Sequence, residues 1–167
     1  MGLLPRLIER LDMNTTSILF VCHGNICRST MAQSVMQHMV DELGRSGDFL
    51  IDSAATTYEE IGNPMYPPAR RKLADEGVPI VGHHARRIDA DEAFAWDYIV
   101  CMDEENIRHL RRILGNDSME RVSKLLSWAG ISRDVADPWY TGDFDATYRD
   151  VVTGCSALLE HIDRRRE

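Results

Sequence analysis

The segment that most constrains the fold lies at residues 17–30, where two kinds of sequence pattern meet. An apolar run ends at Val21 and a helical pattern starts at Met31, so a strand passes through a short loop into a helix. Cys22 opens that loop and Arg28 closes it. In a loop of this shape, backbone N–H groups and the helix N-terminus converge on one point and favour a bound anion.

The loop carries the groups that a phosphate site and a nucleophile need. An arginine grips two phosphate oxygens through a planar fork of donors, and the positive field favours the thiolate form of Cys22. Gly24 permits close backbone approach, and Ser29 offers either a hydrogen bond to the sulfur or a helix cap. The alternatives are a buried thiol at the strand end and a solvated Arg28, although a helix N-terminus is a poor place for a cation. The loop therefore indicates a thiolate aimed at phosphorus.

Strand and helix patterns alternate along the whole chain. The expected strands lie at 17–22, 49–54, 97–102 and 121–126, and the expected helices at 29–43, 67–76, 103–114 and 144–164. Continuous apolar strands such as 98–102 are typical of a parallel sheet that helices cover on both faces. The expected fold class is therefore α/β, with a ligand site at the carboxyl ends of the strands.

Composition narrows the possible partners and compartments. A chain of 167 residues suits one domain, and its net charge of −8 argues against a nucleic-acid partner. No apolar run reaches membrane-spanning length and no signal peptide is visible, so no membrane partner is expected. Four scattered cysteines do not make a secreted disulfide scaffold, which favours a reducing cytoplasm. A zinc site at Cys22, His23 and Cys27 is discounted because no second ligand pair follows at metal spacing.

Residues 1–16 stand apart from this pattern. Leucine and isoleucine side chains from Leu3 to Leu11 would line one side of a short helix, which is marginal without a partner surface. The residues leave open whether this extension is a docking helix or only an upstream start. We therefore expect an N-terminal extension at 1–16 and one domain at 17–167.

The segment Cys22–Thr30 resembles the phosphate-binding loop of the low molecular weight protein tyrosine phosphatases. Further motifs follow in that family's order: Asp52-Ser53-Ala54, Gly62 with Pro64 and Pro67, His83-His84-Ala85-Arg86, the run from Asp97 to Asp103, and Asp137-Pro138-Trp139-Tyr140. The resemblance implies a single Rossmann-like domain with a four-stranded parallel sheet. It implies an enzyme without cofactor or metal that hydrolyses phosphotyrosine proteins or small aryl phosphates and is inhibited by phosphate-like oxyanions.

The resemblance also assigns catalytic roles. Cys22 attacks phosphorus to form a phosphocysteine, Arg28 stabilises the transferring group, and Asp137 serves as general acid and then base. From the residues alone, Asp137 before a proline is equally well an Asx turn. Nearby competitors for the acid are Asp143, Asp145 and Asp150. The implied phosphate-binding residues are Cys22, His23, Gly24, Asn25, Ile26, Cys27, Arg28 and Ser29.

Supporting and substrate-facing residues follow from the same resemblance. A network that holds the loop in shape is expected from Asn25, Ser29, Ser53 and His83. The expected pocket walls are Ile26, Tyr58, Glu59, Trp139 and Tyr140, with Glu59 where the family usually has an aromatic residue. A carboxylate there disfavours acidic peptides, and isoleucine at position 26, where arginine phosphatases have threonine, favours phosphotyrosine over phosphoarginine. Cys27 is expected to trap Cys22 as a reversible disulfide, to pack as a thiol, or to do both.

Two rival functions share parts of this pattern. A thioredoxin-coupled arsenate reductase needs two further relay cysteines on a mobile segment, whereas Cys101 falls in an expected strand and Cys155 in an expected helix. A phosphopeptide-binding module without turnover would lack the nucleophile, the arginine or the acid. A phosphatase is therefore the favoured function.

Overall fold

The computed structural model describes residues 15–167. Residues 1–14 of the extension expected at 1–16 therefore lie outside the described residues. The strands are β1 (Thr16–Cys22), β2 (Phe49–Ala55), β3 (Tyr98–Cys101) and β4 (Val122–Lys124). The α-helices are α2 (Arg28–Glu42), α3 (Pro67–Asp75), α4 (Glu104–Leu114), α5 (Pro138–Thr141) and α6 (Phe144–Arg166). Short 3₁₀ helices are η1 (Ser46–Asp48), η2 (Ala90–Glu92), η3 (Asn116–Arg121) and η4 (Leu125–Ala129).

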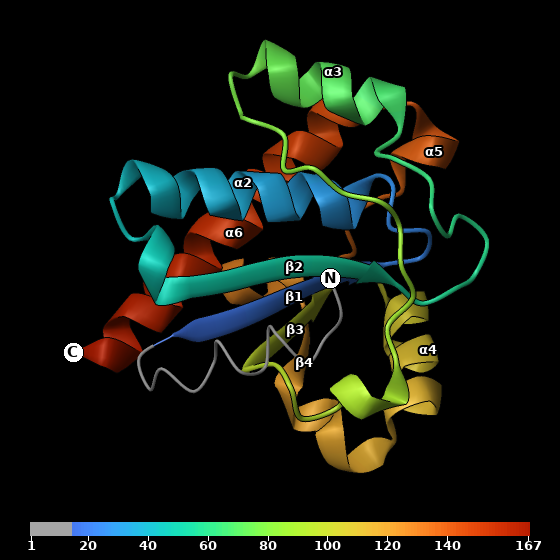
Figure 1. The fold of residues 1–167 in the computed structure, drawn as a ribbon, viewed down its shortest axis with the longest axis vertical. Helices are drawn as coiled ribbons and strands as arrows, with labels where there is room; N and C mark the ends of the chain where they lie inside the picture. Colours follow the sequence, from blue (N-terminus) through green and yellow to red (C-terminus); the bar gives the residue numbers. More distant parts are fainter. Residues whose placement is uncertain (1–14) are drawn as a thin grey trace.

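The four strands form one parallel sheet in the order β2-β1-β3-β4, which confirms the predicted α/β class (Figure 1). The register pairs Cys22 with Ala55 on β2, and the preceding Val21 with Cys101 on β3. The carboxyl ends of three strands therefore meet at one edge of the sheet. The chain leaves this edge in the loops before α2 and α4, which places both helix starts beside one another.

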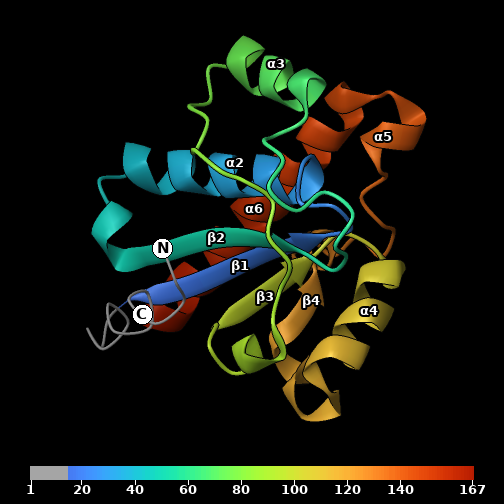
Figure 2. The same cartoon turned by 45° about the vertical axis from the view of Figure 1, so that its right-hand side comes forward.

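Alternation along β1 divides the core into two layers. Ile18 and Phe20 belong to the cluster that packs under α2 and α6, whereas Leu19 and Val21 belong to a second cluster that contains Leu110 of α4. All four β1 side chains have no exposed surface. Figure 2 shows α2 and α6 on one side of the sheet and α4 on the other. Because β1 is covered on both faces, its sequence is apolar throughout.

The structure departs from the expected boundaries at the fourth strand. The strand expected at 121–126 stops at Lys124, and the chain continues as η4. This turn places Leu125 against α6 at Gly154, where an added Cβ would lie 2.3 Å from the leucine Cγ. Close packing against the helix therefore ends the strand early. The short helix α5, directly after Asp137, was not expected.

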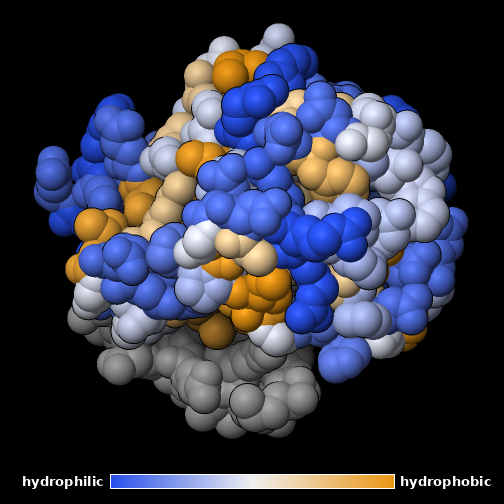
Figure 3. Space-filling view, turned by 90° about the horizontal axis from the view of Figure 1, so that it is seen from above, coloured by the Kyte–Doolittle hydropathy of each residue, from blue (hydrophilic) through white to orange (hydrophobic). Residues whose placement is uncertain are grey.

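Polar residues predominate on the face of the molecule seen in Figure 3. The face in Figure 3 is largely hydrophilic, and its apolar residues form small separate patches. No helix in residues 15–167 is long and apolar enough to cross a bilayer.

Candidate active site

The site lies where β1 ends and α2 begins. Cys22 closes the strand, and its side chain sits in the core with 3% of its surface exposed. The backbone N–H of Asn25 donates to the Cys22 Sγ at 3.3 Å, so the loop curls back over the sulfur. Position at the carboxyl edge of a parallel sheet agrees with the general location of ligand sites in α/β proteins.

Asn25 stabilises this loop conformation through a left-handed backbone and the hydrogen bonds of its fully buried side chain. Its φ of 61° lies in the left-handed region, which asparagine tolerates better than most residues. Its side-chain oxygen accepts hydrogen bonds from the Arg86 backbone N–H at 3.2 Å and from the His83 ring, whose Nε2 lies 2.6 Å away. Its Nδ2 donates to Ser29 at 2.9 Å and to Ser53 at 3.0 Å. The four residues expected to form the supporting network thus meet in the structure.

The network holds the Ser29 hydroxyl beside the sulfur of Cys22. A backbone N–H can only donate, so the Arg86 contact identifies the oxygen of Asn25 and leaves its amide nitrogen as the donor to Ser29. Ser29 Oγ accepts that bond and lies 3.0 Å from Cys22 Sγ, and toward a thiolate it can only donate, because a thiolate carries no hydrogen. A hydroxyl that donates to sulfur stabilises the thiolate. No side chain caps the N-terminus of α2, so the capping role considered for Ser29 is not observed.

Arg28, the first residue of α2, is held by three acceptors from distant parts of the chain. Its Nη1 donates to Asp103 at 2.7 Å and to the Val135 carbonyl at 3.0 Å, and its Nη2 donates to Asp137 at 3.3 Å. The guanidinium is 3% exposed. Burial acts to lower the pKa of Arg28, but the charges of Cys22 and Asp137 and the bond to Asp103 outweigh it and raise that pKa. The arginine is therefore a fixed cation beside the sulfur.

Asp137 caps a helix with one carboxylate oxygen and faces Arg28 with the other. Its Oδ1 accepts from the backbone N–H of Trp139 at 3.0 Å and so caps α5, while its Oδ2 faces Arg28. The side chain keeps 24% of its surface exposed. The competing acids have other partners: Asp143 accepts from the Ala146 backbone N–H, Asp145 pairs with Lys72, and Asp150 pairs with Arg133. Among the described aspartates, Asp137 is the one that lines the cavity at Cys22.

Both apolar and charged side chains line the cavity above the sulfur of Cys22. It is lined by Cys22, His23, Gly24, Ile26, Cys27, Arg28, Glu59, Glu60, Asp137, Trp139 and Tyr140. Trp139 packs its ring 4.9 Å from that of Tyr66, centroid to centroid, and remains 54% exposed. An exposed aromatic face beside the acid suits a flat ring of substrate.

Tyr58, expected as a pocket wall, is not among the lining residues of the described chain. Its ring lies 4.4 Å under the guanidinium of Arg87 and is 69% exposed. The turn after β2 instead presents Glu59 and Glu60 to the cavity. Glu60 packs over Gly24, where an added Cβ would lie 3.3 Å from its Cγ. The absence of a side chain at Gly24 therefore leaves space for Glu60 at the rim as well as for the tight turn of the loop.

The four cysteines are free thiols in different settings. Cys27 lines the cavity with Cys22, and burial, together with the charge of Cys22, raises the pKa of its thiol. Cys101 lies in β3 and Cys155 in α6, both buried with a raised pKa, as their sequence positions predicted. The relay that an arsenate reductase needs is therefore missing from the described chain.

Besides Glu60 on the cavity wall, two residues that support the site were not predicted as such. Asp103 accepts from Arg28, and Gln33 accepts from the Ser53 hydroxyl at 2.6 Å, which extends the network into α2. The sequence signals for Asp103 are its place just after an apolar strand and its position at the end of the Asp97–Asp103 run.

Comparison with known proteins gives a consistent result. A family model described as "Low molecular weight phosphotyrosine protein phosphatase" matches residues 17–167. The chain is 37% identical over 153 residues to the low molecular weight protein-tyrosine-phosphatase YfkJ of Bacillus subtilis, covering 90% of this chain and 98% of that protein. It is 37% identical over 157 residues to the human low molecular weight phosphotyrosine protein phosphatase, covering 89% and 97%. The crystal structure of YfkJ superimposes with a TM-score of 0.89 over 93% of this chain and 99% of that chain, at 35% identity.

Proposed function

This chain belongs to the low molecular weight phosphotyrosine protein phosphatase family, and we propose that it hydrolyses phosphotyrosine through a phosphocysteine on Cys22. It is a low molecular weight protein tyrosine phosphatase by homology. The observation that carries the mechanism is the meeting of three groups at one cavity. Cys22 Sγ lies 3.0 Å from the Ser29 hydroxyl, and Cys22, Arg28 and Asp137 line the same cavity.

In the first step the Cys22 thiolate attacks phosphorus, an S–P bond forms and the P–O bond to the tyrosine ring breaks. Asp137 passes its proton to the departing phenolate oxygen. Arg28 and the loop N–H groups hold the equatorial phosphate oxygens while charge shifts among them. Because Arg28 is already fixed by Asp103 and Val135, little reorganisation is needed when phosphate binds.

In the second step water attacks the phosphocysteine. Asp137, now a carboxylate, takes a proton from that water, a P–O bond forms and the S–P bond breaks. The thiolate returns to the Ser29 hydroxyl, which makes sulfur a better leaving group. Inorganic phosphate is released, and phosphate-like oxyanions that occupy the same donors act as competitive inhibitors.

The rim supports a preference among substrates. Ile26 and Trp139 offer apolar surface to a phenyl ring, and Glu59 and Glu60 give the mouth negative charge. Carboxylates at the mouth disfavour acidic residues beside the phosphotyrosine and favour lysine or arginine there. Phosphotyrosine in a basic peptide context is therefore the proposed substrate class.

The first test is release of phosphate from p-nitrophenyl phosphate and from a phosphotyrosine peptide, with a chelator present. Wild type should turn over both, and Cys22→Ser should abolish turnover, while Cys155→Ala, which removes a cysteine that does not line the cavity, retains it. A burst of phenol ahead of phosphate would support the covalent intermediate. Absence of turnover by freshly reduced protein would overturn the proposal and direct attention to phosphopeptide binding without hydrolysis.

A further inference from the structure

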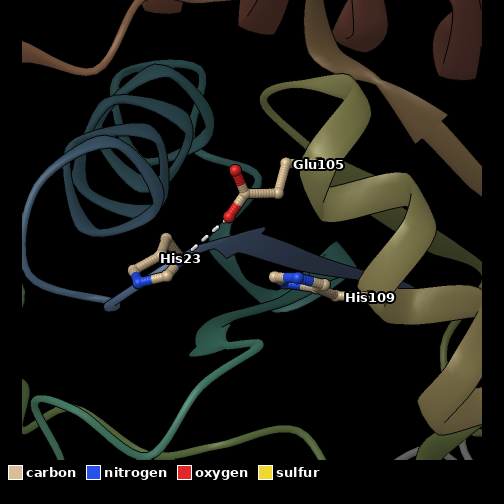
Figure 4. A group of neighbouring side chains, drawn as sticks. All are labelled: His23, Glu105 and His109. Carbon is tan, nitrogen blue, oxygen red and sulfur yellow. Dashed lines mark ion pairs between the residues drawn. The ribbon is translucent and has the colours of Figure 1, made fainter.

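Three side chains outside the catalytic set converge beside the phosphate loop. They are His23 of the loop and Glu105 and His109 of α4 (Figure 4). Each offers one ligand atom, and these atoms all lie within 4.8 Å of one another. The Nδ1 of His23 is 3.4 Å from Glu105 Oε1, and the two histidine ring centroids are 6.4 Å apart.

The fold brings this group together from two chain segments. Glu105 and His109 are four residues apart on α4, so they lie one turn apart on the same side of the helix. His23 follows Cys22 at the end of β1, and α4 follows the neighbouring strand β3. The three side chains thus meet because β1 and β3 are neighbours in the parallel sheet, and the spacing of these residues in the sequence does not predict it.

Each histidine ring also has a hydrogen-bond partner outside the group. The Nε2 of His23 lies 2.8 Å from Glu59 Oε2, and the Nδ1 of His109 lies 3.3 Å from the Thr56 hydroxyl. A carboxylate on one ring nitrogen fixes the tautomer and turns the other nitrogen toward a metal, as is usual for metal-bound histidines. The Glu59–His23 pair has this arrangement, and its Nδ1 faces Glu105.

We infer that His23, Glu105 and His109 form a binding site for a divalent cation of the zinc type. Two imidazole nitrogens and one carboxylate oxygen are a common zinc ligand set, which leaves a fourth position open to water. Glu105 is exposed and both histidines are partly exposed, so an ion reaches the group from solvent. This site differs from the cysteine-containing cluster discounted from the sequence and shares only His23 with it.

The site lies at the rim of the catalytic cavity, because His23 also lines that cavity. The alternative is that a protonated His23 simply pairs with Glu59 and Glu105. That ion pairing needs no contribution from His109. The effect of a His109 substitution on metal affinity therefore distinguishes a metal site from a simple ion pair.

Calorimetric titration of Zn²⁺ into the reduced Cys22→Ser protein tests the site without the nucleophilic sulfur as a competing ligand. We expect one saturable site, with affinity reduced at least about tenfold by His109→Ala or Glu105→Gln in that background. His84→Ala, which removes an exposed histidine outside the group, is the matched control and should bind as the parent does.

Titration with Co²⁺ gives a second readout. A nitrogen and oxygen site produces the ligand-field absorption of bound cobalt without thiolate charge transfer, and the signal should disappear with His109→Ala. Thermal unfolding of the variants, and turnover of His109→Ala with a chelator present, show that they are folded. No saturable binding to Cys22→Ser, or unchanged affinity in both ligand variants, would overturn the inference without affecting the proposed phosphatase mechanism.

Discussion

Asp103 Oδ2 lies 2.7 Å from the Nη1 of Arg28 and thereby links the end of β3 to the start of α2. The other oxygen of the same carboxylate accepts the Asn106 backbone N–H at 2.7 Å and caps α4. One side chain therefore both starts a helix and fixes the cation of the cavity. Asp103 does not line the cavity and acts as a positioning residue.

Asp103→Asn tests this double role. The amide has one oxygen for two donors, so an asparagine that still caps α4 loses its acceptor for Arg28. We expect kcat/KM for p-nitrophenyl phosphate to fall about 10- to 100-fold through misplacement of the guanidinium. Asp103→Ala should in addition lower the free energy of unfolding by about 0.5–2 kcal/mol through loss of the cap. Steady-state kinetics and urea unfolding measure the two effects, and unchanged kinetics in both variants would refute the positioning role.

Asp137→Asn should slow hydrolysis of a phosphotyrosine peptide by about 10²–10⁴-fold, because the phenolate then leaves without a proton. The loss should be smaller for p-nitrophenyl phosphate, whose leaving group needs little protonation. Asp143→Asn is the matched control, because Asp143 caps α6 outside the cavity. Equal losses in the two variants, or for the two substrates, would argue against Asp137 as the acid.

Asn25→Ala and Asn25→Gly separate backbone strain from the side-chain network. Both remove the bonds to Ser29, Ser53 and His83, but only glycine adopts a φ of 61° without steric penalty. Asn25→Ala should therefore be the less stable variant by about 1–2 kcal/mol. Urea unfolding of both proteins gives this difference directly, and an alanine variant as stable as the glycine one would show that the loop relaxes. Turnover should fall in both.

Cys27→Ser tests the expected redox pairing. Peroxide oxidises the Cys22 thiolate to a sulfenic acid, and the Cys27 thiol then displaces water from it to form a disulfide. The pKa of Cys27 is raised by burial, so this thiol is protonated at neutral pH and disulfide formation should accelerate as pH rises. Without that trap, further peroxide oxidises the sulfenic acid to a sulfinic acid, which thiols do not reduce. We therefore expect dithiothreitol to restore wild type treated with excess peroxide but not Cys27→Ser treated in the same way. Intact mass distinguishes the disulfide from added oxygen, and equal recovery of both proteins would leave Cys27 as a packed thiol only.

Much of this architecture follows from local sequence. The apolar strand before Cys22, the arginine six residues later and the helical pattern beyond predict the phosphate loop, because strand, loop and helix start are adjacent in the chain. The expected helix at 144–164 and strand at 49–54 likewise agree with α6 and β2 within two residues. These features depend on near neighbours and on the burial of each residue.

Tertiary structure decided which distant side chains complete the site. Asp103 is 75 residues from Arg28, and it reaches the guanidinium only because β3 lies beside β1 in the parallel sheet. The conformation of the turn after β2 places Glu59 and Glu60 on the cavity wall, while the Tyr58 ring packs under Arg87. The meeting of His23 with His109 has the same origin. Strand order brings such residues together, and no local pattern in the sequence specifies strand order.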